Sequence, residues 1–473
     1  MAKKKQVPSS GAKSLKRWMM VIPTLAALIK LIIVFRIQPI AWPGVDPSLY
    51  RLDKYWLGAD GENYITGLSG LFSDGLFSEV ERLTYFPAGY PILIYLFGFW
   101  SQALSLTFAA VLQTLLYGFA SGYFVFKLME TRLVRFAFPV ALILALNPTL
   151  SLSSYAIGYE SLVASLLLIV LGLLITDVTK SHDRAISSQV LVAAALFSIM
   201  SFTQPRMIAT ALVVFAIWAL ATRKKSVAAL MMLVTMAITL LLPATLYMRN
   251  IVARDVPAIS TNLGTTIFIG IGPEATGGYN GKYNGVPCPE AVGTEAEVDS
   301  AKVKCAIEWY VNNPVRTVEL AAKKATFFWS PWFGPIANGT MARNPWAQNH
   351  PLKSTAQTQQ GYDFIFGASG KAISWIWQIS TLTFLGLGFF VLWRMNGVER
   401  LLGIAALAIV AINMFVSMAT IGDHRFRLPV AGLSLFLQAV GLTWALSKRK
   451  RRGFGSEEKL LWKSFQRTTN LRA

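Results

Sequence analysis

Residues 160–176 read ESLVASLLLIVLGLLIT, one acid followed by sixteen residues without a charge. About 20 residues of this kind cross the hydrocarbon core of a bilayer as a helix. Similar stretches recur along the chain, at 18–39, 90–103, 107–127, 134–150, 160–176, 187–203, 206–222, 227–247, 373–393, 401–419 and 428–446. The sequence therefore predicts an all-α polytopic membrane protein.

The composition supports this prediction. Of the 473 residues, 54% are hydrophobic and 14% are charged, whereas soluble domains carry about 25% charged residues. The formal net charge of +20 fits Lys and Arg placed on the cytoplasmic side of a membrane. These basic residues are scattered between apolar stretches, so nucleic-acid binding is not expected. An ordinary cytosolic enzyme and a soluble domain on a single anchor are both excluded.

The positions of Lys and Arg decide how many of the eleven stretches cross the membrane. If 90–103 crosses, the basic clusters at 127–135, 223–225 and 448–452 all lie outside. If it does not cross, all of them lie in the cytoplasm. This stretch is also short and lies beside Pro87 and Pro91. We therefore expect about ten transmembrane helices, with 90–103 as a juxtamembrane or re-entrant helix and both termini in the cytoplasm.

This topology divides the chain into five parts. They are a cytoplasmic basic tail (1–17), an N-terminal membrane core (18–247) with a first outer loop at about 40–105, a large outer loop (248–372), C-terminal transmembrane helices (373–447) and a second cytoplasmic basic tail (448–473). No cleavable signal peptide is expected. In the large outer loop, 294–312 and 314–329 have helical spacing, and the second is expected to lie along the outer membrane surface.

The two cysteines of the chain, Cys288 and Cys305, both lie in the large outer loop. An oxidising compartment favours a disulfide between them. Two free thiols are the alternative, because the spacing alone does not decide.

Acidic residues mark the predicted outer side. Asp60, in the stretch GADGENY at 58–64, is a candidate general base near the membrane surface. Tyr64 shares its helix face at i, i+4, whereas Glu62 points elsewhere. A solvated loop carboxylate or a helix cap is the alternative for Asp60. Glu160 lies at the outer end of its span, where it either faces headgroups or belongs to a site.

Arginines lie on the same side. Arg206 caps a helix hairpin, and Asp423-His424-Arg425-Phe426-Arg427 forms a short turn between the last two spans. Guanidinium groups suit phosphate through paired donors, and snorkelling toward headgroups is the alternative. Ion-coupled transport usually needs an acid in the middle of a span, and none of the predicted spans has one. A P-loop and the HExxH and GxSxG motifs are missing too.

In their order and spacing, these motifs resemble those of the GT-C membrane glycosyltransferases over about residues 15–447. The bacterial protein O-mannosyltransferase-like and lipid A aminoarabinose transferase-like enzymes are the members concerned. Asp60–Tyr64 is similar to the Asp-Glu-x-x-Tyr motif of the first outer loop, with Gly61 in place of the second acid. Phe86–Pro91 is similar to the Pro-Pro-Gly-Tyr-Pro that follows, and His424–Pro429 to the Arg-Tyr-Arg-Leu-Pro near the last span.

Other positions add to the resemblance. Glu160 stands where the family often has an acid, and Arg249-Asn250 with Ile259–Gly264 resembles the start of its large loop.

The resemblance implies a hexosyl- or pentosyltransferase that uses a sugar on polyprenyl phosphate and inverts the anomeric configuration. It implies Asp60 as the base, Glu160 as a second acid, donor-phosphate binding by Arg206, His424, Arg425 and Arg427, and substrate binding by Glu62, Tyr64, Tyr90, Asn250 and Asn262. No metal ligand is expected and no cofactor is certain, because metal use differs among relatives. The acceptor would be a glycolipid, a polysaccharide or a protein. The enzyme would lie among the lipids of a bacterial plasma membrane, with its active site facing outward.

Two other classes of function remain open. A transporter or flippase for a lipid-linked sugar or another anionic lipid would use the same outer arginines. It would also need polar residues along a path through the spans, and few are visible. A purely structural membrane partner explains the spans but not the clustered outer acids and arginines.

Overall fold

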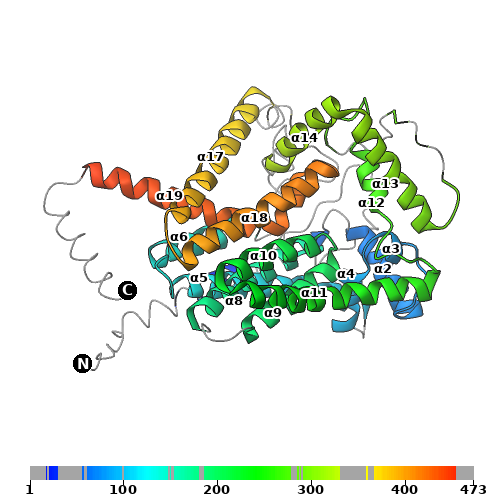
Figure 1. Ribbon diagram of the computed structural model, residues 1–473, viewed down its shortest axis with the longest axis horizontal. Coiled ribbons are helices and arrows are strands. Elements are labelled where there is room, and N and C mark those ends of the chain that lie inside the picture. Colours follow the sequence, from blue (N-terminus) through cyan, green and yellow to red (C-terminus); the bar gives the residue numbers. More distant parts are fainter. Residues whose placement is uncertain are drawn as a thin grey trace.

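The computed structural model describes residues 21–29, 56–57, 61–98, 101–147, 154–180, 186–278, 291–330 and 367–453, with the single residues 18, 150, 285, 286, 288, 358 and 360. Figure 1 shows a body of long helices, in which α10 and α11 run side by side and α17 runs at a steep angle to them, with shorter helices at one end. Within these ranges the only sheet is a parallel pair of two-residue strands, β1 (Trp56–Leu57) and β2 (Ala156–Ile157). The described chain is therefore essentially all-α, as predicted.

In the part of the chain that the structure describes, nine apolar helices of 13 residues or more form this body. They are α5 (Gln102–Leu128), α6 (Val134–Leu146), α8 (Tyr159–Lys180), α9 (Ser188–Thr203), α10 (Met207–Thr222), α11 (Lys225–Arg254), α17 (Ala368–Trp393), α18 (Val398–Ala419) and α19 (Ala431–Gly453). Six described segments are long and apolar enough to cross a membrane: Leu104–Leu128, Tyr159–Thr179, Lys225–Arg254, Trp375–Trp393, Val398–Ala419 and His424–Ser447. Helices α6, α9 and α10 are apolar but shorter. The count of ten spans stays a prediction, and most of its first span lies outside the described residues.

Helix α4 (Gly89–Phe97) covers the start of the stretch expected not to cross. Its nine residues extend about 14 Å at the α-helical rise, against a hydrocarbon core of about 30 Å. Gly98 ends α4, and the Ser101 side chain then caps α5 by accepting a hydrogen bond from the Leu104 amide. A helix of this length fits the expected juxtamembrane position.

Close backbone contacts hold the long helices together. The body is built from packed pairs, among them α5 with α8, α9 with α11 and α17 with α19. At the α17–α19 crossing, a Cβ on Gly388 would lie 1.8 Å from the Leu437 carbonyl oxygen. Only glycine therefore allows the two helices to approach this closely.

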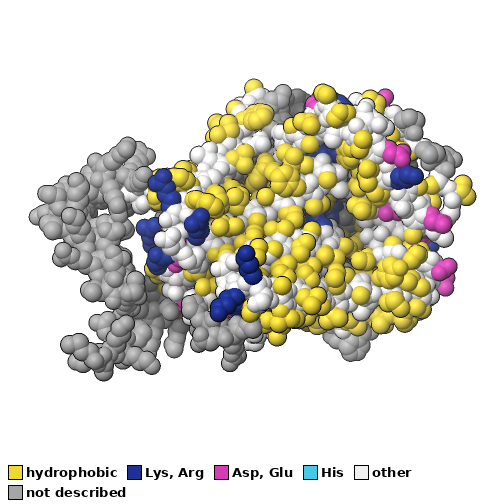
Figure 2. Space-filling view, in the orientation of Figure 1, with side chains coloured by type: hydrophobic (Ala, Val, Ile, Leu, Met, Phe, Trp, Pro, Cys, Tyr) yellow, Lys and Arg dark blue, Asp and Glu magenta, His cyan; other side chains and the backbone are white. Residues whose placement is uncertain are grey.

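On the face that Figure 2 shows, most of the visible basic and acidic side chains lie at different ends of the body. In Figure 2, Lys and Arg gather at one end, here called the basic end, and Asp and Glu gather at the other, here called the loop end. At the basic end, Arg223 pairs with buried Asp177 at 2.7 Å, and Arg132 pairs with Glu399 at 2.8 Å. The positive-inside rule predicts that the basic end faces the cytoplasm, and this orientation stays a prediction.

Two outer loops pack together at the loop end. The first contributes α2 (Gly61–Asp74), α3 (Arg82–Tyr85) and α4, and the second α12 (Leu263–Ile269), α13 (Glu295–Asn312) and α14 (Pro314–Trp329). The Thr84 carbonyl accepts from the Thr261 amide at 3.0 Å, and the Thr84 hydroxyl donates to Glu295 at 2.9 Å. These contacts fix one loop to the other.

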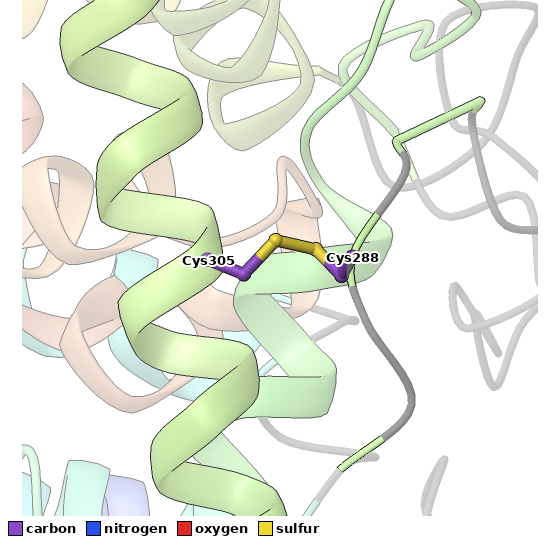
Figure 3. Close-up of a disulfide and its surroundings, with 2 residues drawn as sticks. All are labelled: Cys288 and Cys305. Carbon is purple, nitrogen blue, oxygen red and sulfur yellow. A yellow bond between two sulfur atoms is a disulfide. The ribbon is translucent and has the colours of Figure 1, made fainter.

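The large outer loop has the two helices that were predicted, and a disulfide ties the chain before the first of them to that helix. Thr294 starts α13 with a reciprocal capping box, and Pro314 starts α14. Cys288 and Cys305 are joined, with 6.0 Å between their Cα atoms, and this bond ties the preceding chain to α13 (Figure 3). Helix α14 packs on α18 and on the 3-10 helix η2 (His424–Val430). Its expected position along the membrane surface stays a prediction.

Candidate functional site

The β1–β2 pair brings the first outer loop to the start of α8. Trp56 pairs with Ala156, and Leu57 pairs with Ile157. Helix α2 begins at Gly61, and its Tyr64 ring lies 6.5 Å from the Tyr159 ring of α8. Asp60, the predicted base, lies outside the described residues, between these two contacts in the sequence.

Glu160 and Arg425 form the central contact of the site. Glu160 is the second residue of α8, where the helix dipole favours an acid. Its Oε1 accepts a hydrogen bond from Arg425 Nε at 2.6 Å, and these side chains are 6% and 8% exposed. A hydrogen bond between two ionised groups is stronger and more directional than a neutral one. Both residues were predicted site residues, and the structure brings them together.

The η2 turn orients three of the predicted residues. Asp423, which was not a predicted site residue, caps η2 by accepting from the Arg425 amide at 2.8 Å. Buried His424 lies with its Nδ1 3.7 Å from Asp423 Oδ1. Arg427 donates from Nη2 to the Ser330 carbonyl at 2.8 Å, and its guanidinium lies 5.5 Å from the Trp329 ring centre. Arg427 thus ties η2 to the end of α14.

Arg206 lies beside this turn with two of its nitrogens unmatched. Its guanidinium carbon is 4.9 Å from the Phe426 ring centre and 6.0 Å from the Tyr159 ring centre. Nε and Nη2 are buried and have no hydrogen-bond partner in the part of the chain that the structure describes. A buried donor without an acceptor costs about 1–3 kcal/mol. An anion with oxygen acceptors would satisfy both nitrogens.

Two predicted tyrosines form an aromatic wall next to Glu160. Tyr64 and Tyr90 are buried, and their ring centres are 5.1 Å apart. The Tyr90 hydroxyl donates to Gln113 Oε1 at 2.9 Å and accepts from the Gly158 amide at 2.9 Å. Burial raises the pKa of the Tyr90 phenol, so this hydroxyl stays protonated and is not a base.

The other three predicted substrate-binding residues lie differently. Glu62 is exposed in the first turn of α2. Asn250 is buried and donates from Nδ2 to the carbonyls of Ala258 and Ile259 at 2.8 and 3.1 Å. Asn262 is the N-cap residue of α12. Asn250 therefore holds the chain that follows α11, whereas the Asn262 side chain makes no capping hydrogen bond. Substrate contact by any of the three residues stays a prediction.

Metal ligands do not gather in the described ranges. No group of three or more His, Cys, Asp or Glu side chains there could hold a metal ion. Because Asp60 lies outside these ranges, the expectation of a metal-free site stays a prediction.

Sequence reasoning missed a buried lysine in the large outer loop. Lys324 is 0% exposed, and its Nζ donates to the Tyr310 hydroxyl at 3.1 Å. Burial lowers the pKa of Lys324 to about 7. The signal was its spacing, because Leu320 and Phe328, four residues before and after it, are also fully buried.

No protein-family model and no curated protein matches the chain. It is similar to solved structures of the Archaeoglobus fulgidus oligosaccharyltransferase. The apo form has a TM-score of 0.48 and 15% identity, over 93% of this chain and 52% of that chain. A structure of the archaeal oligosaccharyltransferase AglB with an inhibitory peptide and a dolichol-phosphate has a TM-score of 0.46 and 14% identity, over 95% and 53%. The chain spans about half the length of these proteins.

Proposed function

We propose that this protein is a membrane glycosyltransferase of the GT-C type. It moves a sugar from a polyprenyl-phosphate donor to an acceptor hydroxyl on the non-cytoplasmic face, with inversion at the anomeric carbon. The observation that carries the proposal is the grouping of Glu160, Arg425 and Arg206 at the loop end, at the starts of α8, η2 and α10. This grouping lies next to the strand pair that leads into the Asp60 loop.

The arginines provide what a phosphate leaving group needs. Arg206 has two buried donors without a partner in the described chain, and phosphate oxygens would accept from both. Glu160 holds Arg425 through Nε and so fixes the plane of its guanidinium. Positive groups that are already oriented stabilise the charge that develops as the bond to phosphate breaks. Glu160 in this proposal acts by orienting Arg425.

Asp60 supplies the base. It takes the proton from the acceptor hydroxyl as that oxygen bonds to the anomeric carbon, while the carbon–oxygen bond to phosphate breaks. The freed polyprenyl phosphate keeps the electron pair of that bond. Tyr64, one helical turn after Asp60 in the sequence, presents its ring toward Tyr159 and Tyr90. In the proposal this aromatic wall lies against the transferred sugar.

Release of free polyprenyl phosphate tests the proposal. The purified chain in detergent is given a panel of polyprenyl-phosphate sugars with glycolipid, oligosaccharide and peptide acceptors. We expect release with one preferred sugar, and a loss of about 10²–10⁴ in Asp60→Asn, the usual contribution of a general base. Asp74→Asn is the matched control, because Asp74 is the last residue of α2, away from the candidate site, and accepts from Ser73 and Ser78.

Two results would contradict the proposal. Near-normal turnover by Asp60→Asn would remove Asp60 as the base. No release by the wild-type chain, with lipid still bound through Arg206, would favour a carrier of the lipid-linked sugar.

A further inference from the structure

The first two residues of α4 contact the two segments that lead into the candidate site, one toward Arg206 and the other toward Glu160. A Cβ on Gly89 would lie 1.9 Å from the Phe202 carbonyl oxygen, near the end of α9. No side chain fits there, so the start of α4 lies directly against the chain that continues to Gln204 and Arg206. The close contact at Gly89 thereby fixes the position of residues 202–206, the segment that carries Arg206.

Tyr90, the next residue, reaches the other half. It is 2% exposed, and its hydroxyl both donates to Gln113 and accepts from the Gly158 amide. Gly158 lies directly before α8, two residues from Glu160. The hydroxyl therefore already has a donor and an acceptor partner within the protein.

Gln113 completes this arrangement from the middle of α5. It is 5% exposed, accepts from Tyr90 through Oε1, and donates from Nε2 to the Ala156 carbonyl at 3.2 Å. Two backbone groups of the segment 156–158 are thus held by buried side chains, while β2 in this segment pairs with β1. A fully satisfied buried network of this kind rigidifies the backbone that it contacts.

We propose that Gly89, Tyr90 and Gln113, here called the α4 clamp, are positioning residues that set Arg206 and the Glu160–Arg425 pair at their working separation. The inference rests on the proposed function, and it changes the role that the sequence predicted for Tyr90. Tyr90 acts through Glu160 and does not bind substrate through its hydroxyl. A displacement of about 1 Å in a catalytic group can cost about 10²-fold in rate, so polar groups that bond only to other protein groups still control turnover.

The test removes one hydroxyl and measures local dynamics and kinetics separately. Tyr90→Phe keeps the ring and removes both hydrogen bonds. Tyr117→Phe is the matched control, because it removes another buried tyrosine hydroxyl, which donates to the Leu144 carbonyl at 2.6 Å. We expect faster amide hydrogen exchange over residues 154–160 in Tyr90→Phe only. We also expect its kcat to fall about 10- to 100-fold, with the KM for the donor lipid unchanged within about threefold.

A double variant shows whether Tyr90 acts through Glu160. In a Glu160→Gln background, Tyr90→Phe is expected to change kcat by less than about threefold, since the two changes disable one unit. The inference would be overturned if the losses in kcat from Tyr90→Phe and Glu160→Gln multiplied in the double variant. A raised KM with a normal kcat in Tyr90→Phe would also overturn it. So would an equal loss in Tyr117→Phe. Unchanged exchange over 154–160 would overturn the clamp whatever the activity, whereas a wild-type chain without turnover would overturn the proposed function.

Discussion

Arg425 donates from Nε to Glu160 Oε1 at 2.6 Å, although the two residues lie 265 positions apart in the chain. The bond joins the start of α8 to the η2 turn that leads into α19, and both side chains are buried. Removing one partner of a buried ion pair leaves the other charge uncompensated. The contact therefore joins the stability of the fold to the geometry of the site.

Arg425→Gln is expected to lower both the free energy of unfolding and donor turnover. A loss of about 3–5 kcal/mol is typical of a broken buried pair. Thermal unfolding in detergent and release of polyprenyl phosphate measure the two effects. Lys323→Gln is the control, because it breaks an ion pair with Glu319 in which both side chains are nearly half exposed. If the unfolding temperature of Arg425→Gln is no lower than that of this control, the Glu160–Arg425 pair does not stabilise the fold.

Arg206→Gln is expected to raise the KM for the donor lipid by about 10- to 100-fold. The reason is that hydrogen bonds to a charged group, which would be lost, contribute about 1.5–3 kcal/mol. Thermal stability should not fall, because Arg206 leaves two buried nitrogens unmatched in the described chain. Arg206→Lys restores the charge without the forked donors, so we expect partial recovery. Arg394→Gln is the control, since its guanidinium also lies over a phenyl ring, 4.2 Å from Phe390. An unchanged KM in Arg206→Gln would remove Arg206 from the donor site.

That the candidate site residues lie at one end of the helical body was predictable from the sequence, because the position of a residue at a span end follows from the apolar stretches. Charge segregation then assigned Glu160, Arg206 and Arg425 to one side, and the structure places all three around η2 and the start of α8. Their pairing was not predictable. It depends on how far each helix is rotated and shifted along its axis, and hydropathy does not record this.

Hydrogen bonds between side chains and backbone groups were also not predictable from the sequence. Nothing in the pattern of residues indicates that Tyr90 would meet the Gly158 amide, because that contact depends on where the start of α4 meets the short segment before α8. Asn250 shows the same limit, since its amide bonds the carbonyls of its own following loop. A polar residue in a motif is therefore a weak guide to whether its side chain faces a ligand or the backbone.

Removing the Cys288–Cys305 bond is expected to loosen the large outer loop. The cysteines are 17 residues apart, and closing a loop of this size restricts the unfolded chain by about 3 kcal/mol in the chain-entropy model. The double variant Cys288→Ser, Cys305→Ser should be cut faster by protease near α13, with the membrane helices still intact. Denatured, unreduced wild-type protein should take up no maleimide. Labelling of both thiols would show that the bond does not form in the protein as isolated.

The stability of the packed large outer loop is expected to depend on pH through Lys324. It is fully buried in α14, which packs on α18 and η2, and burial lowers the pKa of Lys324 from 10.5 to about 7. Between these two values the unfolded chain binds more protons than the folded chain, so stability rises with pH through this window. Below about pH 7 both states are protonated, and the full cost of the buried charge is present.

Lys324→Met tests this relationship because it keeps an unbranched side chain, one atom shorter, and removes the charge. We expect it to raise the unfolding temperature most at pH 6 to 7, and to have little effect or lower it near pH 10, where the lost hydrogen bond to Tyr310 dominates. Lys323→Met, at the exposed neighbour, should show no such pH dependence. If the difference between wild type and Lys324→Met is the same at pH 6.5 and pH 9.5, the lysine is charged in the folded protein across this range. Its burial would then be offset by a partner that keeps the ammonium group ionised.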